Sequence, residues 1–227
     1  MEKGLVITID GPAASGKSTV AKIVAKGLKF RYIDSGAMYR ALAFAAHEQR
    51  IGPEEEDRLS ALCQAELFEY LDKEGEFVVL YQGRDITQAV RTEEVGELAS
   101  VYALRPGVRK FLTEFQRRLV QQGRVVVEGR DAGTVVFPEA ELKFYLTAGP
   151  EVRAERRRRE LSAASPPSAV KISRRDERDR SRALAPLTLP PDGIVIDSSA
   201  LSVSQVVEKI LEHIKKFERE ARGAKAG

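Results

Sequence analysis

The sequence contains one cysteine, two histidines and no tryptophan among its 227 residues. Cys63 cannot form an internal disulfide, and with His47 and His213 it gives none of the usual zinc-ligand spacings. A chain of this length buries enough surface to be stable without a disulfide or a metal. These absences exclude small disulfide-stapled secreted domains and the Cys/His metal proteins.

Long hydrophobic runs are also missing from the sequence. No apolar stretch approaches the roughly 18 residues that a membrane span needs. The first residues enter an apolar strand pattern without the basic start and the small-residue cleavage site of an export signal. We therefore expect a cytoplasmic protein with no membrane partner.

A large excess of one charge is missing, because the formal net charge is only +3. The charged residues are nevertheless unevenly distributed along the chain. The segment 151–182 holds eleven Lys or Arg residues and six acidic residues. A local basic excess favours a phosphate-bearing partner, either small or polymeric. The alternative is a solvated helix face that carries ion pairs between residues four apart.

Short apolar segments alternate with amphipathic ones along the chain. This order is typical of βαβ units, so we predict an α/β fold with a central five-stranded parallel sheet flanked by helices. The residues between 66 and 87 are strand-like and broken by turns, which predicts a small antiparallel sheet. Expected strands of the main sheet cover 5–10, 30–33, 124–128, 142–146 and 194–197, and expected helices cover 18–28, 37–49, 54–64, 93–102, 108–122, 151–161, 169–181 and 202–217.

A complete G-x-x-x-x-G-K-[ST] pattern follows the first expected strand and opens the first expected helix. Its glycines allow backbone angles at which successive N–H groups surround an anion, and the helix N-terminus adds to the attraction. Lys17 is expected to reach the outer phosphates of a nucleoside triphosphate, and the Ser18 hydroxyl to ligate Mg²⁺. The predicted ATP-binding loop consists of Gly11, Pro12, Ala13, Ala14, Ser15, Gly16, Lys17, Ser18 and Thr19.

Other features distinguish between the classes of protein that carry this loop. The guanine-reading N/T-K-x-D motif of GTPases is missing, and motor ATPases are usually longer. A small-molecule kinase needs a donor loop, a pocket for an anionic acceptor and a cover that excludes water. The chain offers a candidate for each of the three.

The acceptor pocket is expected at the ends of two strands of the main sheet, 30–33 and 124–128. Arg40 lies about one helical turn after the second strand, and Arg130 and Asp131 follow the strand 124–128. An arginine there can grip a monophosphate through its planar fork, and a carboxylate can accept a hydrogen bond from an exocyclic amine or a hydroxyl. The basic helices within 151–182 are the candidate cover, since guanidiniums neutralise the charge that develops during phosphoryl transfer.

These residues resemble a known family, the bacterial cytidylate kinases, which belong to the nucleoside monophosphate kinases. The resemblance covers nearly the whole chain. It implies a P-loop kinase fold with a small antiparallel insertion on the acceptor side and a helical lid. It also implies transfer of the ATP γ-phosphate to CMP or dCMP with Mg²⁺. The matching segments are ITIDGPAASGKS, DSGAMYR, VEGRDAGTVVFPEA, RRDERDRSRALAP and VIDSS, with Glu128 in place of an Asp that some relatives have.

The resemblance also implies roles for individual positions. Lys17, Arg130 and Arg182 would be catalytic, and Ser18 would bind the metal. The acceptor CMP would be held by Ser35, Tyr39, Arg40, Ser100, Arg109, Arg130, Asp131, Arg175, Asp179 and Arg182. Arg157 and Arg174 would contact ATP.

The same resemblance implies a division of the chain into functional regions. We expect core segments at 1–36, 105–149 and 185–220, an acceptor-binding region at 37–104, a lid at 150–184 and a frayed tail at 221–227. No long apolar stripe is left over after the core helices are assigned, which favours a monomer.

Two alternative functions remain open. One is a P-loop kinase for another nucleoside monophosphate or another small anionic acceptor. The other is an RNA-binding ATPase whose basic segment grips the nucleic-acid backbone. The segment 151–182 contains no Phe, Tyr or Trp, although proteins that bind single strands use such side chains for stacking. We therefore expect nucleotides as the partners and no nucleic acid.

Overall fold

The computed structural model describes residues 5–64, 66–73, 76–121, 123–160 and 169–223. It confirms the five-stranded parallel sheet, whose strand order is β2-β6-β1-β7-β8. The central strand β1 has β6 and β7 as its neighbours, and the two short strands lie at the edges. The strands are β1 (Val6–Asp10), β2 (Arg31–Asp34), β6 (Val125–Gly129), β7 (Leu142–Thr147) and β8 (Ile194–Asp197).

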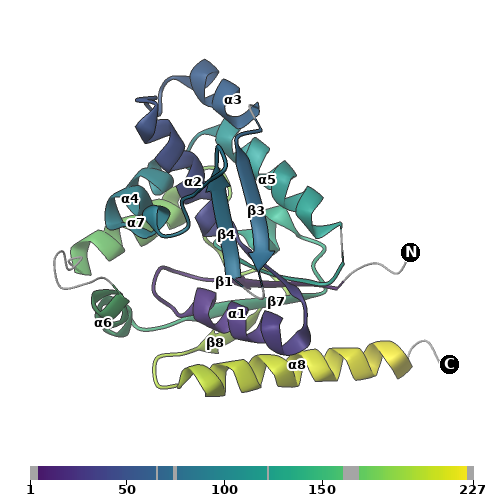
Figure 1. Ribbon diagram of the computed structural model, residues 1–227. Coiled ribbons are helices and arrows are strands. Elements are labelled where there is room, and N and C mark those ends of the chain that lie inside the picture. Colours follow the sequence, from purple (N-terminus) through teal and green to yellow (C-terminus); the bar gives the residue numbers. More distant parts are fainter. Residues whose placement is uncertain (1–4, 65, 74–75, 122, 161–168, 224–227) are drawn as a thin grey trace.

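Helices cover both faces of this sheet (Figure 1). On one face α1 packs against β2, β6 and the C-terminal helix α8; on the other face α2 packs against β6, and α4 packs on α2. Strands covered on both faces are almost wholly apolar, as the fully buried run of β6 shows. The helices named here are α1 (Lys17–Leu28), α2 (Ser35–Glu48), α4 (Glu93–Tyr102) and α8 (Val203–Gly223).

Four further helices complete the layers. The short helix α3 packs against α5, and α6 and α7 pack together at the edge of the molecule, where α7 also contacts α4. Their bounds are α3 (Glu56–Gln64), α5 (Pro106–Val120), α6 (Pro150–Glu160) and α7 (Ala169–Ser181). Residues 162–168, the gap between the expected helices 151–161 and 169–181, lie outside the described residues.

The predicted insertion is a three-stranded antiparallel sheet of β3 (Phe68–Lys73), β4 (Glu76–Tyr81) and β5 (Arg84–Asp85). Aromatic rings on one of its faces stack, and one pair, Phe68 and Tyr81, has its centroids 5.3 Å apart. The Tyr32 N–H donates to Asp72 Oδ2 at 3.0 Å, which joins the insertion to the edge of the main sheet.

Local capping explains where the structure departs from the predicted boundaries. Helix α2 begins two residues before the predicted start, because Asp34 Oδ1 accepts a hydrogen bond from the Ala37 N–H at 2.7 Å. At α8 the reciprocal bonds of Ser202 and Gln205 form a capping box at the predicted helix start. The helix continues to Gly223, so residues 221–223 of the expected tail are helical, and 224–227 lie outside the described residues.

Two short helical turns escape prediction. Ala89–Arg91 forms a 3₁₀ turn and Ala132–Val136 forms a single π-helical turn, in which the Phe137 N–H donates to the Ala132 carbonyl at 2.7 Å. Such π turns are rare and gather at functional sites. Within the described ranges, no helix is long and apolar enough to cross a membrane.

The packing of α8 on α1 gives a first test. We expect Ile210→Ala to lower the free energy of unfolding by about 2–4 kcal/mol, because Ile210 is fully buried and its truncation leaves a cavity. The matched control Val203→Ala, on the same helix at 44% exposure, should change it by less than about 0.5 kcal/mol. Urea denaturation measures both, and equal losses in the two variants would contradict this packing.

Candidate functional site

The loop between β1 and α1 has the backbone of an anion-binding nest. Gly11 and Gly16 have φ angles of +147° and +95°, which side chains disfavour. A Cβ atom on Gly11 would lie 2.0 Å from the carbonyl oxygen of Leu146, so no larger residue fits there. Ala14 also has a positive φ of 56°. The N–H groups that follow Gly16 belong to the first turn of α1, where the helix dipole favours negative charge.

Lys17 and Ser18 lie at the start of α1 and are tied to their surroundings. Lys17 Nζ donates to the Pro12 carbonyl at 2.7 Å, and Ser18 Oγ donates to Glu128 Oε1 at 2.8 Å. Burial and the neighbouring Arg130 guanidinium lower the pKa of Lys17 to about 7. Burial and the nearby Asp34 carboxylate raise the pKa of Glu128 to about 7. The loop therefore lies beside a cluster of desolvated charges.

Asp10, the last residue of β1, anchors the segment that follows β6. Its Oδ1 accepts from the Ala132 N–H at 2.9 Å and its Oδ2 from the Gly133 N–H at 2.7 Å. These bonds cap the π-helical turn and fix the residues just before it, Arg130 and Asp131. Burial raises the pKa of the Asp10 carboxyl to about 6, although the two N–H groups oppose the shift.

The start of α2 carries the first acceptor candidates. Arg40 Nη2 lies 3.3 Å from Asp34 Oδ2, so the guanidinium is held one turn above the end of β2. Burial would raise the pKa of Asp34, but the Arg40 charge and the Ala37 N–H hold it below its usual value. Ser35, between them in the sequence, is buried and lines a cavity together with Arg40.

Asp131 is the centre of a second charged network. It accepts hydrogen bonds from Arg109 on α5 and from Arg182 Nη2, the latter at 3.2 Å. The Arg109 guanidinium lies 5.7 Å from the centroid of the Tyr39 ring, at cation–π distance. Next to this network, Arg130 Nε donates to Asp179 Oδ2 on α7 at 3.1 Å.

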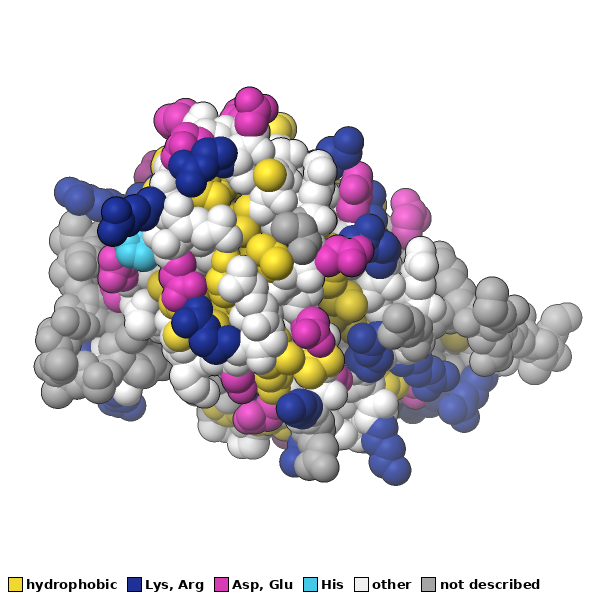
Figure 2. Space-filling model, turned by 45° about the horizontal axis from the view of Figure 1, so that its top comes forward, with side chains coloured by type: hydrophobic (Ala, Val, Ile, Leu, Met, Phe, Trp, Pro, Cys, Tyr) yellow, Lys and Arg dark blue, Asp and Glu magenta, His cyan; other side chains and the backbone are white. Residues whose placement is uncertain are grey.

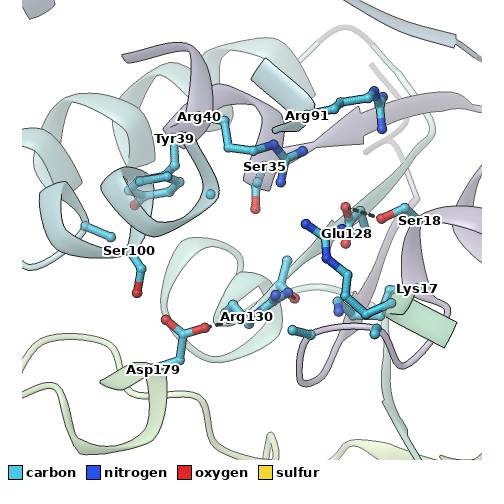
Figure 3. A pocket seen from close by; sticks show the side chains of 18 of the residues that line it. Lys17, Ser18, Ser35, Tyr39, Arg40, Arg91, Ser100, Glu128, Arg130 and Asp179 are labelled. Carbon is cyan, nitrogen blue, oxygen red and sulfur yellow. Dashed lines mark hydrogen bonds and ion pairs between the residues drawn. The ribbon is translucent and has the colours of Figure 1, made fainter. Parts of the chain in front are cut away.

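A single cavity of about 590 Å³ joins these groups. In Figure 3, Lys17, Ser18 and Glu128 lie at one end, Tyr39 and Ser100 at the other, and Arg40 and Arg130 between them. Three buried polar atoms beside the Tyr39 end have no hydrogen-bond partner: Tyr39 Oη, Ser100 Oγ and Arg109 Nη1. Since such atoms are costly unless paired, this end calls for a polar ligand.

The structure brings most of the sequence-predicted residues to this cavity. The predicted residues that line it are Ala13, Ala14, Gly16, Lys17, Ser18, Thr19, Ser35, Tyr39, Arg40, Ser100, Arg130, Asp131, Arg157, Asp179 and Arg182. Gly11, Pro12 and Ser15 form the loop behind the lining, and Arg109 lies behind Asp131. Arg174 is exposed and is not among the lining residues, and the side chain of Arg175 lies outside the described part of the chain.

Sequence reasoning missed one wall of the cavity, formed by α4 and the turn before it. Arg91 and Glu93 line this wall together with small residues of α4. The missed small residues are Gly96, Ala99 and Ala103, the last just after α4; they share one helix face with Ser100, the residue of this wall that was predicted. A small-residue face on an otherwise ordinary helix was the available signal. Glu93 accepts from Arg157 Nη2 at 3.1 Å, so α6 also reaches this wall.

The residues present can hold a hard cation only together with a ligand. No group of three or more His, Cys, Asp or Glu side chains suited to a metal occurs among the described residues. Ser18 and Glu128 supply oxygen atoms side by side at the Lys17 end of the cavity, and oxygen is the ligand type that Mg²⁺ prefers. Phosphate oxygens usually provide the remaining positions in such sites.

Comparisons with known proteins agree with this geometry. The model of the cytidylate kinase family matches residues 7–216. A cytidylate kinase of Geobacillus sp. is 44% identical over 217 residues, which cover 93% of this chain and 97% of that protein. One from Carboxydothermus hydrogenoformans is 43% identical, covering 92% and 96%. A gluconokinase structure from Sinorhizobium meliloti covers 99% of both chains at 14% identity and a TM-score of 0.52, a likeness of fold alone.

The buried Asp10 carboxyl gives a pH test. Its raised pKa means that the folded protein binds a proton more tightly than the unfolded chain. The stabilisation from this group is therefore complete below about pH 4 and is lost as the pH rises through about 6. Relative to Asp10→Asn, the wild type should lose up to about 3 kcal/mol of unfolding free energy between pH 4 and pH 7.

Urea denaturation of both proteins without nucleotide at several pH values measures this difference. Parallel stability profiles for the wild type and Asp10→Asn would show that the Asp10 pKa is not raised in the folded protein.

Proposed function

The chain belongs to the cytidylate kinase family, and we propose that it transfers the γ-phosphate of ATP to CMP or dCMP, giving CDP or dCDP. One observation carries the proposal: a single cavity joins a phosphate-binding loop, a group of arginines and a polar end with unpaired hydrogen-bonding atoms. A kinase for two nucleotides needs these three parts in this order.

The loop end fits the donor nucleotide. Backbone N–H groups from Ala14 to Thr19 and the buried Lys17 ammonium favour the β- and γ-phosphates of ATP. When bound, Mg²⁺ would be held through Ser18, with Glu128 beside it, and would neutralise phosphate charge. Arg157 of α6 lines the cavity, which supports a contact with ATP, whereas the exposed Arg174 has no support from the cavity.

The middle of the cavity fits the acceptor phosphate. Arg40 and Arg130 approach it from α2 and from the end of β6, and Ser35, the first residue of α2, lies near Arg40. In the structure their guanidiniums are paired with Asp34 and Asp179. A dianionic phosphate competes well for such forks, because charge-assisted bidentate bonds are the strongest that arginine makes.

The polar end fits cytosine. The base offers an exocyclic amine as donor and a ring nitrogen and a carbonyl as acceptors, so it needs one carboxylate and two donors. Asp131 is an acceptor at this end, and Arg109 Nη1 and Ser100 Oγ are unpaired atoms able to donate. Uracil presents a carbonyl where cytosine has its amine, and the Asp131 carboxylate would repel it.

The reaction needs no general base, because the attacking group is already a phosphate oxyanion. The protein has to align the two phosphates, exclude water and neutralise charge on the transferred group. Lys17, Arg130 and Arg182 are the cations we assign to this work. Arg182 also binds Asp131 and the Ala185 carbonyl, so it links the lid helix α7 to the acceptor site.

The functional regions follow from these assignments. We assign the core to 1–36, 105–149 and 185–220, acceptor binding to 37–104 and the lid to 150–184. Helix α7 lies beside α4 (Figure 1) and packs against α6, and Arg157 of α6 and Asp179 of α7 line the cavity, which supports the assignment of these helices to the lid. We also propose that the protein is a cytoplasmic monomer, as its sequence predicts.

Nucleic-acid binding has less support. Several basic side chains of the proposed lid are engaged in ion pairs, among them Arg158 and Arg159 with Glu155, and Arg178 with Glu97. Over the middle of the face shown in Figure 2, acidic and basic side chains are interspersed with hydrophobic ones, whereas several basic side chains lie near one another at the lower right. A polyanion needs a continuous basic strip.

A substrate panel tests the proposed reaction. With Mg²⁺ and ATP, a coupled ADP-release assay over CMP, dCMP, UMP, AMP and GMP should give the highest kcat/KM for CMP or dCMP. UMP should fall at least about tenfold lower, because one mismatched polar contact costs about 1.5–3 kcal/mol. Equal turnover of UMP would contradict the role of Asp131. Release of ADP only on addition of RNA would instead favour the RNA-binding ATPase.

The variant Arg40→Ala separates the two nucleotide sites. We expect the KM for CMP to rise roughly 10–100-fold and the KM for ATP to change less than about twofold, because only the acceptor phosphate loses a charge-assisted contact. Arg84→Ala is the matched control: Arg84 also pairs with a carboxylate, that of Glu48 at 2.7 Å, but away from the cavity. Steady-state kinetics decide, and an equal rise of both KM values would argue against an acceptor role.

A further inference from the structure

The phosphate loop is held from behind by side chains of α6 and α7 that the proposed reaction does not use. The Ala13 N–H donates to Asp176 Oδ1 at 3.1 Å, and Arg153 Nη1 donates to the Ala13 carbonyl at 3.2 Å. Both polar backbone groups of one loop residue are therefore bound by side chains of the lid helices. Arg153 and Asp176 are themselves buried, at 6% and 4% exposure.

The two side chains also form an ion pair with each other, which we call the Arg153–Asp176 pair. Arg153 Nε further donates to the Ala148 carbonyl at 3.1 Å, so the guanidinium is fixed between the end of β7 and the loop. A buried ion pair gains little net stability, because desolvation offsets its attraction. The stability of the fold alone therefore gives a weak reason for this arrangement, and its contacts with Ala13 give a better one.

A neighbouring arginine repeats the pattern one turn further along α6. Arg156 Nη1 donates to the Ser15 carbonyl at 3.3 Å, and its Nη2 donates to the Ser198 carbonyl at 2.7 Å. Thus the carbonyls of Ala13 and Ser15 both point to arginines outside the nest. A loop that binds an anion must turn its carbonyls away from the ligand, and partners on the outside favour that orientation.

We propose that Asp176 and Arg153 are positioning residues, which orient the Ala13 peptide of the phosphate loop and couple the place of α7 to the binding of the donor triphosphate. This inference rests on the proposed function, because it takes ATP as the ligand of the loop. Neither side chain needs to touch the nucleotide; both act through the backbone of Ala13.

A purely electrostatic role of Asp176 and a positioning role predict opposite changes in ATP affinity when Asp176 is removed. Its carboxylate lies close enough to Lys17 to favour the charged ammonium, so it also faces the region of the phosphates. If charge were its only role, Asp176→Ala would remove a repulsion and strengthen ATP binding. If it positions the loop, the same variant weakens ATP binding. The sign of the change therefore distinguishes the two roles.

Calorimetric titration of the full chain with Mg²⁺ and ATP, and separately with CMP alone, measures the change. We expect Asp176→Ala to raise the Kd for ATP about 10–100-fold and to leave the Kd for CMP within about twofold. Asp176→Asn keeps the volume and an acceptor for the Ala13 N–H, so its loss should be smaller but in the same direction. Arg178→Gln is the control on the same helix, since it breaks an ion pair with Glu97; its Kd for ATP should stay near that of the wild type.

ATP binding that is unchanged or tighter in Asp176→Asn would overturn the inference, and this variant decides alone if Asp176→Ala does not fold. An equal loss in Arg178→Gln, or an equal loss of CMP affinity, would overturn it too, because any disturbance of the lid would then suffice. A wild type that does not bind ATP would instead contradict the proposed function.

Discussion

The site depends on how the protein neutralises the cations that it gathers around one cavity. Guanidiniums brought together in a desolvated space repel one another unless carboxylates lie among them. The structure meets this constraint pair by pair, with Arg40 on Asp34, Arg130 on Asp179, and both Arg109 and Arg182 on Asp131. Nucleotide phosphates offer the same guanidiniums a stronger bidentate partner. Binding can then proceed as an exchange of anions around fixed cations, which needs little rearrangement of the fold.

The parallel sheet is what brings these charges together. Lys17, Arg40 and Arg130 lie far apart in the sequence, but each follows the carboxyl end of a strand, and those strands are adjacent in the order β2-β6-β1. The apolar strands, the glycine-rich loop and the alternation with helices could all be predicted from sequence, because each has a local signal in periodicity or turn chemistry. The strand order was not predicted, since periodicity does not determine which strands pair.

The remaining features of the site are long-range, and this explains why sequence reasoning missed them. The choice of Asp179 as partner for Arg130, or of Glu93 for Arg157, depends on how α7 and α6 dock on the sheet and on α4. No sequence pattern within either helix predicts these partners. Arg174 shows the same limit in reverse: the resemblance implied a contact with ATP, yet its side chain is exposed and outside the cavity lining.

Helix α7 illustrates how one rigid element can connect the two halves of such a site. Asp176 binds the phosphate loop, Arg178 reaches Glu97 on α4, Asp179 binds Arg130, and Arg182 binds Asp131. All four side chains belong to the helix or to the residue that follows it, so none can shift far without the others. In the proposed reaction, a ligand that drew Arg182 towards the acceptor would therefore also move Asp176 beside the phosphate loop. By reciprocity, a triphosphate that favours one place of α7 favours the acceptor contacts made from that place. The physical basis for the proposed joining of donor and acceptor binding is thus the stiffness of about two turns of helix, from which four side chains contact different parts of the molecule.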